Sequence, residues 1–555
     1  MTEVIRQSLR DSKTARWTAL AIVSFTMLTG YFLTDVMSPL KPMLESQKGW
    51  DSAEYGFFTS AYGWFNVFLL MLIFGGILLD KMGVRFTGMG AAIVMVVGTG
   101  IKYWAISTTF SEGAQIFGID AQVAWAAFGF ALFGVGVEIA GITVSKIIVK
   151  WFKGKEMALA MGLEMATARM GTLLAMAISY PLAQYFQDVS APILLCLILL
   201  VIGLLAFFIY TMMDRKLEAS EGEDAEEEEP FKLSDIGVII KNRGFWYIAI
   251  LCVLFYSSVF PFIKYAADLM VNKYHVHPDY AGLIPSLLPL GTLFLTPFFG
   301  NLYDRKGKGA TIMIIGAALL IFVHVMFAIP GLNSWLLAIA LVVILGIGFS
   351  LVPSAMWPSV PKIIPEKQLG TAYALIFYIQ NWGLMGVPLL IGIVLNSTNP
   401  TVYPAKEMVK TSLEQTYTKT FAQMNYKVSE KELKELVDRS AETVINKISA
   451  GEAYEPTENL NVEEVGSKLL SNNLELLSQT VMDGNEDEVM KQIENTAVKQ
   501  TFDGVNDLKV GLTYNYTVPM LIFAMFGVLA MVFAFMLKAE DKRKGYGLEL
   551  PNIQK

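Results

Sequence analysis

Twelve blocks of about 20 mostly apolar residues run through the chain, and they limit its fold more than any other feature. A helix of that length crosses the hydrocarbon core of a bilayer, which is about 30 Å thick. Hydrophobic residues make up 54% of the 555 residues and charged residues 17%, a balance outside the usual soluble range. The sequence therefore predicts an all-α membrane protein with twelve transmembrane helices. The blocks cover residues 17–40, 56–80, 87–108, 122–148, 157–186, 189–213, 244–268, 281–303, 309–331, 334–357, 369–395 and 515–538.

Positive charge is unevenly shared between the loops. Lysine and arginine cluster at the N-terminus, in alternate loops and at the C-terminus, whereas the intervening loops contain few of them. Because cytoplasmic loops carry the excess of these residues, both termini are predicted to be cytoplasmic. The first block follows a basic start and lacks a small-residue cleavage site, so we expect a retained helix. These features predict a multi-pass integral membrane protein.

Two polar segments interrupt the membrane pattern. Residues 218–230 are acidic and are expected to be a solvated cytoplasmic linker. Residues 397–512 lie on the outside, with apolar residues at helical spacing, and Ser429 with Glu432 predicts a capping box. This helical insertion is interpreted as either a passive extracytoplasmic cap or a docking surface for a protein partner. The predicted units are an N-terminal six-helix bundle (1–213), an acidic linker (214–243), C-terminal bundle helices 7–11 (244–396), the extracytoplasmic helical insertion (397–512), and helix 12 with a cytoplasmic tail (513–555).

One motif occurs twice. "GGILLDKMGVR" follows the second block and "GNLYDRKGKG" follows the eighth, and both contain G-x-x-x-D-[KR]-x-G. Matched positions in two six-helix halves indicate a transporter with its site between pseudo-symmetric bundles. We expect the glycines to allow close helix contact and the charged residues to close the cytoplasmic gate. The predicted gating residues are Gly76, Asp80, Lys81, Gly83, Arg85, Gly300, Asp304, Arg305 and Gly307.

Charged residues inside the blocks mark the candidate site. At 1.5 Å per residue, Glu138 lies roughly 15 Å and Arg169 roughly 18 Å from the cytoplasmic ends of their helices, so both are near the midplane. Glu164 precedes Arg169 by five residues, about 140° around a helix, so an ion pair between them is not expected. Glu138 and Arg169 on adjacent helices suit the ammonium and carboxylate of a zwitterion. An ion pair that only joins the two helices is the alternative, and intramembrane charges favour function.

Further polar residues lie at similar depth and are candidates for binding substrate or for interhelical hydrogen bonds. They are Tyr31, Asn66, Tyr256, Gln380 and Asn381. Proton coupling through Glu138 or Glu164 and simple uniport both remain open. The chain has no G-x-x-x-x-G-K-[ST] motif and no catalytic or metal-ligating constellation, so we predict neither an enzyme nor a cofactor nor nucleic-acid binding. The expected partners are the bilayer and a small-molecule substrate, with a monomeric transport unit.

The duplicated motif resembles the loop signature of the major facilitator superfamily. Within that superfamily, the chain resembles lysosomal dipeptide transporters and their prokaryotic relatives over roughly residues 20–395. The segments that carry this resemblance are "VKWFKGKEMALAMGLEMATARMGT", "SSVFPFI" and "MWPSVPKIIPEKQLGTAYALIFYIQNWGL". The resemblance implies a facilitator of dipeptides whose acid and arginine, Glu138 and Arg169 here, bind the substrate termini.

This sequence departs from the resemblance in two ways. An arginine common early in the fourth helix is absent, and the 397–512 insertion has no counterpart. An acidic dileucine sorting signal is also missing, so we predict a prokaryotic cytoplasmic membrane. The alternatives are an organic-anion exchanger of the oxalate–formate type, or a transporter-like receptor or assembly protein that acts through 397–512.

Overall fold

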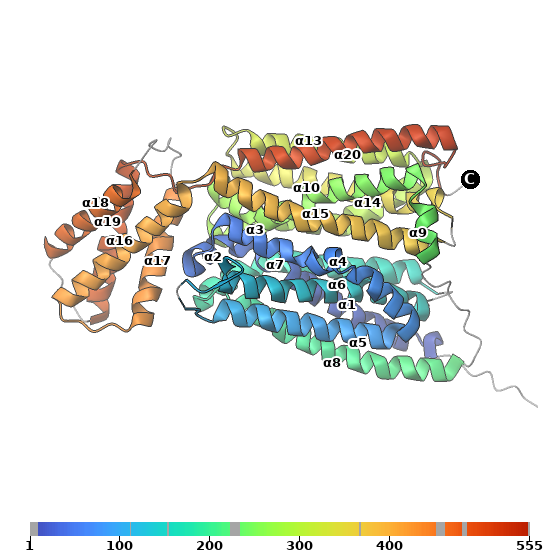
Figure 1. The fold of residues 1–555 in the computed structure, drawn as a ribbon, viewed down its shortest axis with the longest axis horizontal. Helices are drawn as coiled ribbons and strands as arrows, with labels where there is room; N and C mark the ends of the chain where they lie inside the picture. Colours follow the sequence, from blue (N-terminus) through green and yellow to red (C-terminus); the bar gives the residue numbers. More distant parts are fainter. Residues whose placement is uncertain are drawn as a thin grey trace, which may run out of the picture.

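The computed structural model describes residues 9–111, 113–152, 155–221, 233–365, 368–450, 461–479 and 486–552. Residues 222–232 of the predicted acidic linker, which include most of the acidic stretch 218–230, therefore lie outside the described residues. Two helical bundles lie side by side, and a third group of helices, α16–α19, projects from one end (Figure 1). We call this the insertion end. The C-terminus and α9 lie at the opposite end, which we call the linker end.

The N bundle contains the first eight α-helices. They are α1 (Lys13–Asp35), α2 (Lys41–Lys48), α3 (Ser52–Ser60), α4 (Trp64–Phe68), α5 (Met71–Ser107), α6 (Ala121–Phe152), α7 (Met157–Phe186) and α8 (Ala191–Glu221). Short 3-10 turns occur at η1 (Leu9–Asp11), η2 (Ser38–Leu40) and η3 (Ala61–Gly63). The antiparallel strands β1 (Gln115–Ile116) and β2 (Ile119–Asp120) form a hairpin before α6.

The C bundle is connected to the N bundle through α9 (Leu233–Ile239). It contains α10 (Arg243–Tyr274), α11 (Pro278–Ala281), α12 (Leu283–Lys306), α13 (Gly309–Ala328), α14 (Trp335–Ile363), α15 (Leu369–Thr398) and α20 (Thr517–Lys544). The insertion between α15 and α20 contains α16 (Val402–Gln423), α17 (Glu430–Ala450), α18 (Val462–Gln479) and α19 (Glu486–Asp507).

Ten helices in the described residues are long and apolar enough to cross a membrane. Two further spans complete the predicted twelve. One is α7, which contains Glu164 and Arg169; the other is an interrupted helix that runs through α3, η3, α4 and the first part of α5. Gly83, with φ of 74°, divides α5 into the end of this interrupted span and the next span.

The duplicated motif has the same backbone geometry in both copies. Gly83 and Gly307, its last glycines, have φ of 74° and 68°, in the left-handed region where glycine is favoured. Each therefore turns the chain from the second helix of its half into the third. The local conformation supports the internal repeat predicted from the sequence.

The insertion has a hydrophobic core of its own, separate from that of the bundles. Leu413 and Tyr417 of α16 pack in it with Val444 of α17 and Leu469 of α18. The predicted capping box is confirmed: the Glu432 backbone N–H donates to Ser429 Oγ and the Ser429 N–H donates to the Glu432 carboxylate. Polar residues outside the membrane pattern thus form a compact helical unit.

Candidate functional site

Arg169 lies on α7 at the interface between the bundles. Its guanidinium is 5.8 Å from the ring centre of Tyr31 on α1, and 5.7 Å and 5.3 Å from the rings of Phe260 and Phe349. Tyr31 belongs to the N bundle and the two phenylalanines belong to the C bundle. Aromatic faces attract a guanidinium but do not neutralise its charge. Arg169 therefore lies between the two bundles, and these ring contacts leave the N–H groups of its guanidinium available for hydrogen bonds.

Glu138 lies on α6 and has a tyrosine as its neighbour. The Tyr62 hydroxyl donates a hydrogen bond of 2.7 Å to Glu138 Oε1. Tyr62 is part of the 3-10 turn η3, which interrupts the second span. Sequence analysis missed this residue because its partner is 76 positions away. The glycine that follows it, Gly63, was the local sign of an interrupted helix.

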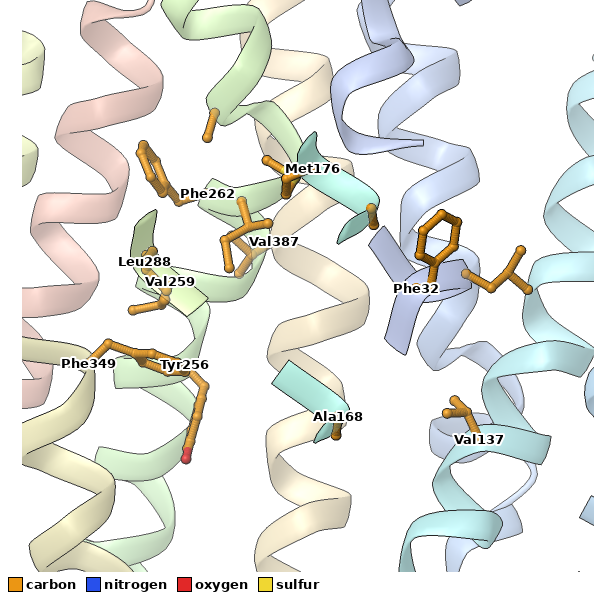
Figure 2. Close-up of a cluster of buried hydrophobic side chains, with 14 of the residues drawn as sticks. Phe32, Val137, Ala168, Met176, Tyr256, Val259, Phe262, Leu288, Phe349 and Val387 are labelled. Atoms are coloured by element: carbon orange, nitrogen blue, oxygen red, sulfur yellow. The ribbon is translucent and has the colours of Figure 1, made fainter. Parts of the chain in front are cut away.

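Both charged residues lie beside the same part of α1. A Cβ on Gly30 would lie 2.9 Å from Val137 Cγ2. Val137, which directly precedes Glu138, therefore packs against α1 at Gly30. A Cβ on Gly171 would lie 2.2 Å from the Leu28 carbonyl oxygen, so α7 touches α1 only two residues before Gly30. Figure 2 shows Val137 and Ala168, the residues preceding Glu138 and Arg169, at a similar level along their helices. The two charges thus share one depth.

Glu138 and Arg169 nevertheless form no ion pair with each other. Within the described part of the chain, Arg169 forms no close ion pair with a carboxylate, and Glu138 accepts its hydrogen bond from Tyr62. An ion pair that merely joins α6 and α7 would require direct contact. Among the described residues, therefore, these two charges do not join α6 and α7 through an ion pair.

The other predicted binding residues lie in three places. Asn66 on α4 donates a hydrogen bond of 3.4 Å to the Gly134 carbonyl and one of 3.5 Å to Asn381 Oδ1 on α15. The second bond connects the two bundles. The Tyr256 hydroxyl accepts from Trp357 Nε1 at 3.1 Å, and its ring stacks on Phe260 beside Arg169. Gln380 is buried and accepts from the Cys252 thiol. The Tyr31 ring contacts Arg169 directly, whereas Tyr256 contacts Phe260, whose ring lies next to Arg169.

Glu164 stays apart from these contacts. Its side chain is partly exposed and makes no hydrogen bond or ion pair within the described residues. In particular it does not pair with Arg169, in keeping with their separation around α7.

The predicted gating residues pair within their own bundles. Asp80 forms an ion pair of 2.9 Å with Lys146, and Arg85 forms one of 2.8 Å with Glu218. In the C bundle, Asp304 accepts a hydrogen bond of 2.7 Å from Asn552 Nδ2. Lys81 and Arg305 are exposed. Among the described residues, therefore, these contacts of Asp80, Arg85 and Asp304 each stay within one half.

The expected close helix contact at the first glycine of each motif is wrong for this structure. A Cβ added to Gly76 or Gly300 would meet no heavy atom within 4 Å. Both glycines lie near the linker end, and no hydrogen bond or ion pair between described residues joins the bundles there. Neither glycine therefore faces a packed partner.

At the insertion end, by contrast, polar contacts join the bundles. Lys41 pairs with Asp268 at 2.9 Å, and Lys264 pairs with Asp35 at 2.5 Å. Backbones also approach closely, because a Cβ on Gly56 of α3 would lie 2.9 Å from Gly392 Cα of α15. The sequence could not show that these charges pair across the two halves.

The fold and this site define a membrane transporter with two related halves. Residues 20–388 match the Major Facilitator Superfamily, and the chain belongs to that family, as the repeated motif predicted. Among its relatives is the lysosomal dipeptide transporter MFSD1 of Homo sapiens, 27% identical over 399 residues, which are 69% of this chain and 80% of the relative. The Danio rerio protein of that name is 29% identical over 392 residues, 68% of this chain and 80% of the relative.

Solved structures show the same fold. A bacterial homolog of the human lysosomal transporter Spinster, inward-facing and unoccupied, matches with a TM-score of 0.58 at 14% identity, covering 95% of this chain and 99% of that one. A D-xylose–proton symporter matches with a TM-score of 0.51 at 15% identity, covering 68% of this chain and 90% of that one. These similarities confirm the predicted twelve-helix fold.

Proposed function

We propose that this protein moves dipeptides or similar small zwitterions across a membrane by alternating access. The observation that carries the proposal is the pair of Glu138 and Arg169: opposite charges at one depth, near the bundle interface, and not paired with each other. Intramembrane charges without a counter-ion are costly unless a ligand uses them. The human relative, a lysosomal dipeptide transporter whose alignment covers 69% of this chain, supports the same substrate class.

In this proposal each charged end of the substrate has its own binding residue. The Arg169 guanidinium can hold a carboxylate through two parallel hydrogen bonds. Glu138 accepts the ammonium, since one carboxylate oxygen already accepts from Tyr62 and the other is available. The rings of Tyr31, Phe260 and Phe349 surround the guanidinium with apolar faces, and a less polar surrounding strengthens its interaction with the carboxylate.

The conformation fits an inward-facing state in this proposal. Lysine and arginine enrichment assigns the linker end to the cytoplasm and the insertion to the outside, with both termini cytoplasmic. The bundles are joined at the insertion end, by Lys41–Asp268 and Lys264–Asp35 among others. In the opposite state the motif around Asp80 and Asp304 would join the halves at the cytoplasmic end. The prokaryotic cytoplasmic membrane remains a prediction.

One chain supplies both halves of the site, so the transport unit is a monomer in this proposal. No step requires a second substrate, so we propose uniport. Peptide-driven acidification of the liposome lumen would instead show proton coupling through Glu138 or Glu164.

Counterflow of labelled dialanine in liposomes tests the substrate class. We expect uptake that unlabelled dipeptides compete away and that free dicarboxylates do not. Competition by dicarboxylates alone would identify an organic-anion exchanger instead. Absence of flux with a correctly folded protein would contradict the proposed function.

A further inference from the structure

The first inference concerns Tyr62 and rests on the proposed function. The turn that carries it is clamped between two helices of different bundles. A Cβ on Gly134 of α6 would lie 2.2 Å from the Tyr62 carbonyl oxygen. A Cβ on Gly63 would lie 2.8 Å from Met385 Cβ on α15. The backbone around Tyr62 is therefore fixed against both the helix of Glu138 and the opposite bundle.

The side chain of Tyr62 is fixed as well. Its ring lies 5.7 Å from that of Phe130 on α6, and its hydroxyl reaches Glu138 Oε1. A carboxylate with one oxygen held by a fixed hydroxyl has a defined orientation, because rotation would break a charge-assisted hydrogen bond. Interruptions of membrane helices occur where the backbone is buried in protein or lines a binding site.

We propose that Tyr62 is the positioning residue for recognition of the substrate amine. Its hydroxyl holds Glu138 so that the second carboxylate oxygen receives the ammonium of the peptide. Tyr62 itself need not touch the substrate. The residue therefore determines the preference for peptides with a free amino terminus.

Binding of dialanine and N-acetyl-dialanine to the full-length protein tests this assignment. Tyr62→Phe removes only the hydroxyl, and we expect dialanine affinity to fall about tenfold, the size of one charge-assisted hydrogen bond. The affinity for N-acetyl-dialanine should stay unchanged. Because Tyr62 acts through Glu138, Tyr62→Phe should cost nothing further in a Glu138→Gln background.

The matched control is Tyr417→Phe, which removes a buried hydroxyl that contacts Ser440 within the insertion. It should leave both affinities unchanged. Additive losses in the double variant, or equal losses for the two peptides, would overturn the positioning role while leaving the proposed function intact. If the wild type binds neither peptide, the proposed function is wrong and this assignment falls with it.

The second inference concerns the insertion and is carried by different contacts. Although α16–α19 are inserted into the C bundle, they also contact the N bundle. The Tyr403 hydroxyl donates a hydrogen bond of 2.7 Å to the Gly49 carbonyl, and Lys410 Nζ donates one of 2.6 Å to the Ser46 carbonyl. On α17, Glu442 accepts a hydrogen bond from Tyr180 of α7. The insertion thus spans both halves at one end.

Buried charges strengthen this attachment. Lys406 of α16 pairs with Glu45 of α2 at 3.1 Å, with side-chain exposures of 9% and 4%. The Tyr514 hydroxyl, just before α20, donates 2.6 Å to the same Glu45. The Tyr514 ring lies 4.6 Å from Lys406 Nζ and 4.4 Å from Lys41 Nζ. Both ends of the insertion therefore meet on α2, next to the Lys41–Asp268 pair.

We infer that the insertion is an intramolecular strap that holds the insertion end closed. The strap is attached covalently to the C bundle and by polar contacts to the N bundle. Separation of the bundles at this end must break those contacts. The strap therefore favours the conformation seen here and must leave α2 in each transport cycle.

Reversible cross-linking tests the second part of this inference. In the full-length protein, Ser46→Cys and Lys410→Cys would be joined by a flexible, reducible bis-thiosulfonate reagent. We expect cross-linking to abolish dipeptide counterflow and reduction to restore it. The control joins Arg439→Cys to Glu494→Cys, an ion pair of 2.7 Å between α17 and α19. That link lies inside the strap and should leave transport unchanged.

Spin-label distances test the first part without a substrate. Labels at Tyr185→Cys in the N bundle and Asn333→Cys in the C bundle lie on exposed residues, whereas the native Cys196 and Cys252 are buried. Lys406→Met should increase the population of longer distances. Its control, Lys431→Met, alters an exposed pair on α17 and should not. Unchanged distances in Lys406→Met, with an unchanged melting temperature, or transport by the Ser46–Lys410 cross-linked protein, would overturn the strap.

Discussion

Lys41 and Asp268 form an ion pair of 2.9 Å between the N and C bundles, with side-chain exposures of only 2% and 1%. The Tyr516 hydroxyl and the Asn272 side-chain amide also donate to the Asp268 carboxylate. A buried charge pair of this kind is sensitive to loss of one partner, because the remaining charge is left without compensation. The closed insertion end therefore depends on the two residues together.

Single replacements of this pair should open the insertion end more than the double replacement. Lys41→Met or Asp268→Asn alone disrupts the pair and destabilises the closed state by about 3–5 kcal/mol. The Lys41→Met/Asp268→Asn variant removes both charges and should recover most of that loss. Spin-label distances between Tyr185→Cys and Asn333→Cys measure the open population. Equal opening in all three variants would contradict the role of the pair.

Replacement of Arg169 should abolish transport with little loss of stability. Arg169→Lys should fail almost as fully as Arg169→Ala, because a point charge cannot reproduce the two parallel hydrogen bonds of the fork. We expect at least about a tenfold loss of flux from these bonds. Counterflow and the melting temperature check this together. A large fall in melting temperature would instead indicate a structural role.

Replacement of Glu138 should act selectively on the amine. Glu138→Gln is expected to weaken binding of dialanine by about 10-fold to 100-fold, the worth of hydrogen bonds to a charged group. N-acetyl-dialanine has no ammonium and should bind both proteins alike. Thermal-shift titrations with the two peptides compare the affinities. Similar losses for both would remove the assignment of Glu138 to the amino terminus.

Asp80→Asn should slow turnover more than it weakens binding. The Asp80–Lys146 pair lies at the linker end, far along the helices from Arg169, and the motif is expected to act when that end closes. We therefore expect kcat for counterflow to fall several-fold while the dialanine Kd measured in detergent stays constant. A parallel change in both quantities would place Asp80 in substrate binding.

Attachment of the strap should be stronger in acid. Burial raises the pKa of Glu442 above its ordinary value of 4.5, so the attached state binds this proton more tightly than the detached state. The contribution is fully present below the ordinary pKa and is lost as pH rises through the raised pKa. The titratable and charged groups around Glu442 and along the adjoining cavity are Tyr180, Asp279, Asp438, Glu45, Lys406, Glu407 and Lys410.

Labels at Tyr185→Cys on α7 and Glu435→Cys on α17 report this attachment. We expect the short-distance population to decrease as the pH rises above 4.5, the ordinary pKa of a glutamate. Glu442→Gln should remove most of this dependence, because an amide does not titrate in that range. A pH response unchanged by Glu442→Gln would assign it to another group in the cavity, such as Glu407.

The candidate site was predictable to different extents. Glu138 and Arg169 were identifiable because a charge inside an apolar block is conspicuous, and counting 1.5 Å per residue gives its depth. Tyr62 was not, because a tyrosine in such a block is ordinary and its value comes from a partner on another helix. The ring contacts of Arg169 were hidden for the same reason, since Phe260 and Phe349 look like ordinary core residues.

By itself the sequence determined the twelve spans, the internal repeat and the family, and it predicted the depth of Glu138 and Arg169. These follow from local properties: hydrophobic length, the glycines of a repeated turn, and the fixed rise of a helix. Only the tertiary structure decided which charges pair. Asp35, Lys264 and Asp268 connect the halves, Asp80 pairs with Lys146 of its own bundle, and the insertion reaches back to Glu45. Pairing depends on how two bundles pack, and an apolar block has the same sequence whichever end is closed.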